Sequence, residues 1–102
     1  MNNADKGIVL KIFSQENCRP CQILKAVIES EREDLEAQGV TIEHVDITPG
    51  IRDDRAEIIE KYGIMSTPVT AIERNGHKLA QVAGMVNIGE LYDMIEHSKT
   101  AK

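Results

Sequence analysis

The chain has 102 residues, 41% of them hydrophobic and 28% charged, so a single folded domain spanning residues 1–102 is expected rather than a disordered chain. Its 12 basic and 17 acidic residues give a formal net charge of −5, which argues against a nucleic-acid or anionic-membrane binder, because such proteins need a basic surface. No apolar run approaches the ~20 residues that span a bilayer and no signal sequence is recognisable, so a cytoplasmic protein is expected.

The first predicted elements are a strand over residues 8–13 and a helix that follows it. The strand segment is nearly all apolar and rich in β-branched residues, which is typical of a strand buried on both faces of a sheet. Residues 14–18 are polar and predict a loop. Pro20 suits the first turn of a helix, where its missing N–H is not needed. Apolar residues then recur at helical spacing as far as Leu35, and Gly39 is the expected left-handed stop.

A second strand and a short helix are predicted in the middle of the chain. Residues 40–47 are predicted to form the second strand, and residues 48–50 (Thr-Pro-Gly) break it. Asp53 or Asp54 can cap a helix that ends at Gly63.

The last third of the chain predicts a hairpin and a final helix. Residues 69–72 and 78–82 read as strands joined at Asn75-Gly76, a strong signal for a tight turn. Asn87 with Glu90 three residues later resembles a capping box at the start of a helix.

The order of elements is therefore strand, helix, strand, helix, strand, strand, helix. The first strand-helix-strand crossover should be right-handed and parallel, whereas the hairpin is antiparallel. These patterns predict an α/β protein with three α/β/α layers and a four-stranded mixed sheet.

The two cysteines of the chain are neighbours, in the sequence Cys18-Arg19-Pro20-Cys21. They fall at the predicted strand-to-helix junction, where free backbone N–H groups and the helix dipole stabilise a thiolate. The thiolate of Cys18 is stabilised most at this position, and Arg19 adds a positive charge beside it. Cys21, one helical turn further on, should be more buried. The two-residue gap lets the second sulfur attack a mixed disulfide formed on the first. The pattern favours a redox-active dithiol that needs no bound cofactor.

Three other interpretations of the pair stay open. A structural disulfide is disfavoured because closing so short a loop gains only about 2 kcal/mol, against about 4.7 for a loop of 100 residues. Half of a zinc site is disfavoured because His44, His77 and His97 are far apart along the chain, so no metal site is predicted. The third alternative is a fold that merely retains the pair.

Three separated segments resemble the thioredoxin superfamily, over about residues 8–95. Residues 18–21 are similar to its active-site motif. Residues 61–68, which end in Thr67-Pro68, are similar to the segment that leads to its cis-proline. Residues 74–76 with 82–84 resemble its terminal hairpin and the glycine after it.

The resemblance implies roles for individual residues. Pro68 would be in cis and face the sulfurs of Cys18 and Cys21 as part of the catalytic centre, and the backbone of Thr67 would pair with an extended substrate segment. The residues expected to contact substrate are Arg19, Pro20, Met65, Thr67, Gly84 and Met85. The two methionines are also candidates for core filling, and the glycine for a simple turn.

The chain departs from thioredoxins proper at the expected proton acceptor. Their buried Asp, six residues before the first Cys, is replaced here by Ile12, and its Lys partner by His44. The Trp before the first Cys is Asn17. His44 is a candidate acceptor for Cys21, because the ordinary pKa of histidine is near 6.5. The plainer interpretation is a histidine on a partly exposed strand.

The length of the chain is closer to that of glutaredoxins. Only seven residues precede Ile8, so the N-terminal strand and helix of thioredoxins are expected to be lacking. Glutaredoxins hold glutathione with a Gly-Gly and an acidic residue near the last helix, whereas residues 84–87 here are Gly-Met-Val-Asn, so no dedicated glutathione site is expected.

The function implied is that of a thiol-disulfide oxidoreductase that reduces or exchanges disulfides in protein substrates. A thiol or flavoprotein reductase, or glutathione, would supply the electrons to the Cys18/Cys21 dithiol of a monomeric protein without nucleic-acid or membrane partners. The alternative is a thioredoxin-fold binding module or subunit in which the redox pair is secondary. The direction of electron flow is left open by the sequence.

Overall fold

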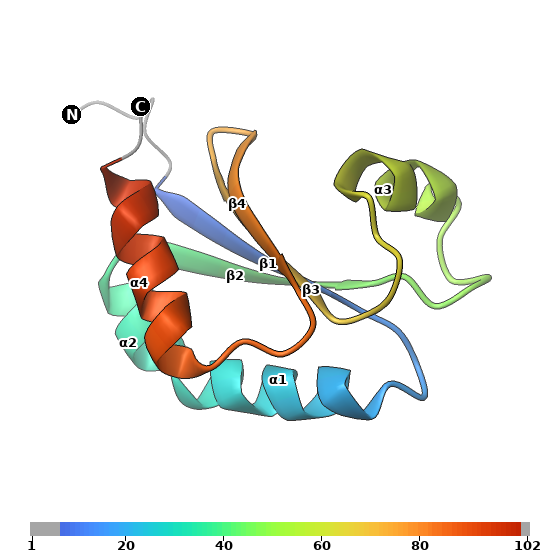
Figure 1. Ribbon diagram of the computed structural model, residues 1–102, viewed down its shortest axis with the longest axis horizontal. Coiled ribbons are helices and arrows are strands. Elements are labelled where there is room, and N and C mark those ends of the chain that lie inside the picture. The colour runs from blue at the N-terminus through green and yellow to red at the C-terminus, as the bar shows by residue number, and fades with distance from the viewer. Residues whose placement is uncertain (1–6, 101–102) are drawn as a thin grey trace.

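Four strands form a single mixed sheet in the computed structural model, which describes residues 7–100 (Figure 1). They are β1 (Ile8–Ser14), β2 (Val40–Asp46), β3 (Val69–Arg74) and β4 (His77–Ala83), in the order β2-β1-β3-β4. β1 runs parallel to β2 and antiparallel to β3, and β3 pairs antiparallel with β4. The predicted four-stranded mixed sheet is confirmed.

Helices cover both faces of this sheet, as the three-layer prediction required (Figure 1). They are α1 (Arg19–Ser30), α2 (Arg32–Ala37), α3 (Arg55–Tyr62) and α4 (Ile88–Lys99). α1, α2 and α4 pack on one face with an aliphatic cluster, while α3 lies on the other face with a smaller cluster. Within residues 7–100 no helix is both long and apolar enough to traverse a bilayer.

Successive side chains of β1 point to opposite faces of the sheet and so contribute to both clusters. Leu10 and Ile12 are fully buried on the side of α1 and α4, whereas Phe13 packs against Tyr62 of α3, with ring centroids 4.5 Å apart. Val9 and Lys11, on the α3 side, remain partly exposed. The prediction of a strand buried on both faces thus holds only near its C-terminal end, because α3 is short and covers only that part of the sheet.

Two local predictions held only in part. The long helix predicted up to Gly39 is divided at Glu31, whose N–H bonds to the carbonyl of Ile28 three residues back and ends α1. Asp54 occupies the N-cap position of α3, one of the two positions predicted, but its carboxylate makes no capping hydrogen bond and accepts from Arg52 at 2.7 Å.

The turn and cap signals in the rest of the chain were correct. Gly63 ends α3 in the left-handed conformation, with a φ of +61°. Asn75 and Gly76 both have positive φ, at +53° and +81°, as the predicted hairpin turn requires. The side chain of Asn87 accepts from the N–H of Glu90 at 2.8 Å and caps α4.

Candidate active site

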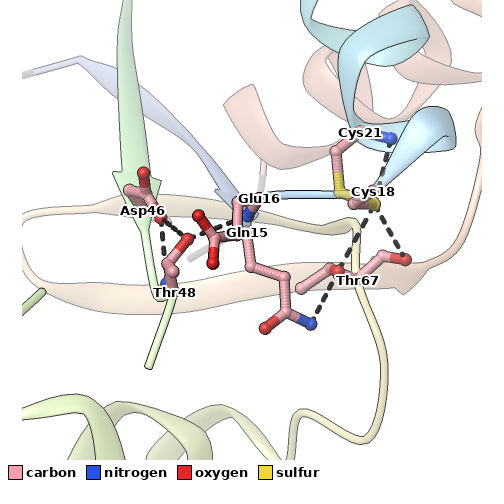
Figure 2. Close-up of a disulfide and its surroundings, with 7 residues drawn as sticks. All are labelled: Gln15, Glu16, Cys18, Cys21, Asp46, Thr48 and Thr67. Atoms are coloured by element: carbon pink, nitrogen blue, oxygen red, sulfur yellow. Dashed lines mark hydrogen bonds between the residues drawn. A yellow bond between two sulfur atoms is a disulfide. The ribbon is translucent and has the colours of Figure 1, made fainter. Parts of the chain in front are cut away.

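Cys18 and Cys21 form a disulfide at the start of α1, with a Cα–Cα distance of 5.2 Å (Figure 2). Cys18 occupies the N-cap position, and its sulfur accepts a hydrogen bond from the N–H of Cys21 at 3.2 Å. Cys21 is fully buried, whereas Cys18 is only partly buried. An incoming sulfur nucleophile can therefore reach Cys18 but not Cys21.

Thr67 lies across from the disulfide and contacts the sulfur of Cys18 twice. Its hydroxyl donates to Cys18 Sγ at 3.4 Å, and its carbonyl oxygen lies 3.6 Å from the same atom (Figure 2). A sulfur in a disulfide carries no proton, so the carbonyl contact is a close approach and not a donated hydrogen bond. The Thr67–Pro68 peptide bond is cis. The structure thus brings Thr67 to the cysteine pair from a segment 49 residues away in sequence.

Gln15 joins this cluster from the loop that follows β1. Its amide nitrogen donates to the hydroxyl of Thr67 at 3.2 Å, so that Gln15, Thr67 and Cys18 form a continuous chain of hydrogen bonds (Figure 2). Gln15 was not among the residues predicted from the sequence, because a polar residue in a predicted loop carries no pattern that reveals its partner.

A second polar cluster holds the same loop against the end of β2. The Thr48 hydroxyl accepts from the N–H of Glu16 at 2.8 Å and donates to the Asp46 carboxylate at 2.6 Å. The hydroxyl and N–H of Thr48 keep the pKa of Asp46 below its usual value. Thr48 was predicted only to break a strand, yet it is buried and its hydroxyl holds the loop that leads to Cys18.

The remaining residues predicted to contact substrate are Arg19, Pro20, Met65, Gly84 and Met85. Arg19, Pro20, Met65 and Met85 are all exposed, and the exposed fractions of the two methionines are 96% and 49%. Neither methionine fills the core. The N–H of Gly84 donates to the carbonyl of Pro68 at 2.8 Å, so this glycine ties the end of β4 to the cis peptide.

His44 lies beside Ile12 in the parallel register, as the resemblance to thioredoxins implied. Its ring, however, contacts the carboxylate of Glu29 in α1 at 2.8 Å. Glu29 lies eight positions after Cys21, which corresponds to about 12 Å along a helix. The geometry therefore does not support His44 as the proton acceptor of Cys21.

No group of three or more His, Cys, Asp or Glu side chains within the described part of the chain gathers closely enough to hold a metal ion.

Comparisons with known proteins agree with this geometry. A family model described as a thioredoxin-like domain matches residues 1–99. The thioredoxin of Chlamydia caviae is 33% identical over 93 residues, which cover 90% of this chain and 84% of that protein. The thioredoxin of Rickettsia bellii is 32% identical over 90 residues, which cover 88% of this chain and 80% of that protein.

Solved structures show the same fold. A mutant thioredoxin from Halobacterium salinarum superposes with a TM-score of 0.74 at 24% identity, over 95% of this chain and 79% of its own. The thioredoxin of Fasciola hepatica gives a TM-score of 0.73 at 19% identity, over 91% of this chain and 82% of its own.

Proposed function

The chain belongs to the thioredoxin-like domain family, and we propose that it reduces disulfide bonds in protein substrates. Together with its thioredoxin relatives, the bonded Cys18–Cys21 pair makes it a thiol-disulfide oxidoreductase. The observation that carries the proposal is the asymmetry of the pair: Cys18 is partly exposed at a helix N-terminus, and Cys21 is fully buried behind it.

The reaction follows from this asymmetry. In the reduced protein the Cys18 thiolate attacks one sulfur of a substrate disulfide; a Cys18–substrate bond forms, and the other substrate sulfur leaves as a thiolate. Cys21 then loses its proton and attacks Cys18, which releases the second substrate thiol and closes the Cys18–Cys21 bond. Two electrons pass to the substrate, and an external dithiol or thiol must return them.

The position of Cys18 supports its role as the attacking sulfur. The first turn of α1 contains no acidic side chain, and the N–H of Cys21 donates to the Cys18 sulfur at the positive end of the helix. This N–H and the helix dipole favour the negative charge of a thiolate. The exposed methionines Met65 and Met85 would offer apolar contact to a polypeptide substrate.

A cytoplasmic location, with recycling by a flavoprotein reductase or a small thiol such as glutathione, belongs to the same proposal. Both cysteines of the chain are in the reactive pair, so folding requires no oxidising compartment. A reduction potential at or below the cytosolic glutathione poise would support electron donation, whereas a value near about −120 mV would indicate an oxidant instead. We expect the protein to elute as a monomer in size-exclusion chromatography.

The direct test is reduction of insulin disulfides with dithiothreitol as the electron source. The wild-type protein should accelerate the reaction, and Cys18→Ser should abolish the acceleration. Gln22→Ala, an exposed change in the same helical turn, serves as the control and should retain activity. A Cys18→Ser protein as active as wild type would refute the proposal.

A further inference from the structure

Gln15 is linked to the cysteine pair through Thr67, whose hydroxyl accepts from the Gln15 amide and donates to Cys18 Sγ. We propose that Gln15 is a positioning residue for the reaction and that its amide directs the hydroxyl proton of Thr67 toward Cys18 Sγ (Figure 2). This inference rests on the proposed role of Cys18 as the attacking sulfur.

The hydrogen-bonding capacity of a hydroxyl explains how the amide acts. A threonine hydroxyl has one proton to donate and two lone pairs to accept with. The Gln15 amide donates to one of those lone pairs at 3.2 Å. The amide nitrogen can only donate, so it cannot accept the proton of the Thr67 hydroxyl. The hydroxyl therefore donates that proton to the Cys18 sulfur, 3.4 Å away.

The effect of this arrangement depends on the redox state. In the disulfide, sulfur is a weak acceptor, and the bond from Thr67 contributes little. After reduction the same sulfur becomes a thiolate, and a hydrogen bond to a charged acceptor is roughly twice as strong as a neutral one. Gln15 should therefore favour the Cys18 thiolate, and with it the reduced form of the cysteine pair, by acting through the Thr67 hydroxyl.

The three residues come from separate segments, so the fold sets their geometry. Gln15 is in the loop after β1, Thr67 precedes β3, and Cys18 caps α1. Charged residues close by include Glu16 and Arg19 along the chain, and Asp46, whose carboxylate accepts from the Thr48 hydroxyl that binds the same loop. None of the substitutions below alters these charges, so a difference between variants does not arise from a change in charge.

The test compares Gln15→Leu in three backgrounds: Thr67, Thr67→Ser and Thr67→Val. The readout is the rate at which iodoacetamide alkylates Cys18 of the reduced protein as a function of pH, with the labelled cysteine assigned by mass spectrometry. In the wild-type Thr67 background or with Thr67→Ser, Gln15→Leu should raise the midpoint of the alkylation pH profile by about half a pH unit. At pH values below the midpoint this corresponds to a roughly threefold loss of alkylation rate. With Thr67→Val there is no hydroxyl to direct, so Gln15→Leu should have no effect.

Two outcomes would overturn the inference: an unchanged midpoint in Gln15→Leu, or an equal shift in the Thr67→Val background. The second outcome would mean that Gln15 acts through solvation or loop structure. Gln15→Ala is made in parallel, because Gln15 is partly exposed and its truncation leaves the core intact. The alkylation profile does not depend on insulin turnover, so failure of the proposed function would be visible separately.

Discussion

His44 Nε2 lies 2.8 Å from the carboxylate of Glu29, so this histidine links β2 to the middle of α1. Arg32 binds the same carboxylate at 2.7 Å, and together the arginine and the histidine lower the Glu29 pKa to about 2. His44, which matches a buried lysine of thioredoxins proper, is thus part of a surface cluster of charged side chains with Glu29 and Arg32.

The first prediction concerns this histidine. His44→Gln should leave the rate and pH profile of insulin reduction unchanged, because the ring is held by Glu29 and not by the cysteine pair. The free energy of unfolding should change by no more than about 0.5 kcal/mol, as is usual for exposed ion pairs. Steady-state assays between pH 5 and pH 9 decide the point; a His44→Gln protein that accumulates the mixed disulfide would show that His44 does receive the proton of Cys21.

The second prediction separates the two sulfurs. Cys21→Ser should retain the attack by Cys18 but lose the resolving step, so a covalent complex with substrate should accumulate. Mass spectrometry under non-reducing conditions should detect one substrate bonded to Cys18. Cys18→Ser is the matched control and should trap nothing, because Cys21 is fully buried. Equal trapping by both variants would contradict the assigned order of attack.

The third prediction concerns Met65, whose exposed fraction is 96%. A side chain so exposed contributes nothing to the core, so Met65→Ser should alter the free energy of unfolding by less than about 0.5 kcal/mol. If the methionine contacts substrate, KM for a protein disulfide should rise roughly fivefold while kcat is unchanged. Kinetics that match the wild type would exclude Met65 from the substrate surface.

The fourth prediction compares two glycines with similar backbone angles. Gly7 and Gly39 have φ values of +78° and +84°, so alanine is strained at either position by about 1–2 kcal/mol. A Cβ at Gly7 would in addition lie 2.7 Å from the carbonyl oxygen of Gly39, whereas a Cβ at Gly39 meets no atom within 4 Å. Gly7→Ala should therefore be less stable than Gly39→Ala by about another 1–3 kcal/mol. Urea unfolding of both variants measures the difference, and equal losses would contradict the close approach.

The fifth prediction is an alkaline loss of stability that arises from Tyr62. Burial, reinforced by the carboxylate of Glu73 that accepts from its hydroxyl, raises the Tyr62 pKa above 10.0. Burial alone would lower the pKa of Lys11, but its contacts with Glu73 and Tyr62 outweigh this and raise it above 10.5. Both groups bind their protons more tightly in the folded state. Their contribution is complete below about pH 10 and is lost as the pH rises through the folded pKa values.

Tyr62→Phe removes one of the two titrating groups of this cluster. Urea unfolding between pH 8 and pH 11 should therefore show a shallower decline of stability in Tyr62→Phe than in wild type. A decline of the same steepness in both proteins would show that the cluster does not set the alkaline limit.

Much of the fold was predictable because its signals are local. The glycine at position 63, the turn at Asn75-Gly76 and the cap at Asn87 each depend on backbone angles or hydrogen bonds within a few residues. The division of the long helix at Glu31 was missed, because no proline or glycine marks it. The missing capping bond at Asp54 was not predicted, because the side chain of Arg52 binds this carboxylate and helix-capping propensity does not account for such a partner.

The sequence by itself determined the cysteine pair, its place at a helix N-terminus and the order of elements, since these follow from spacing and hydrophobic pattern. Only the tertiary structure decided which polar side chains meet. Gln15 and Thr67 are 52 residues apart, and His44 and Glu29 are 15 apart. Such contacts depend on how strands and helices pack, and a side chain in a loop has no periodicity from which its partner can be read.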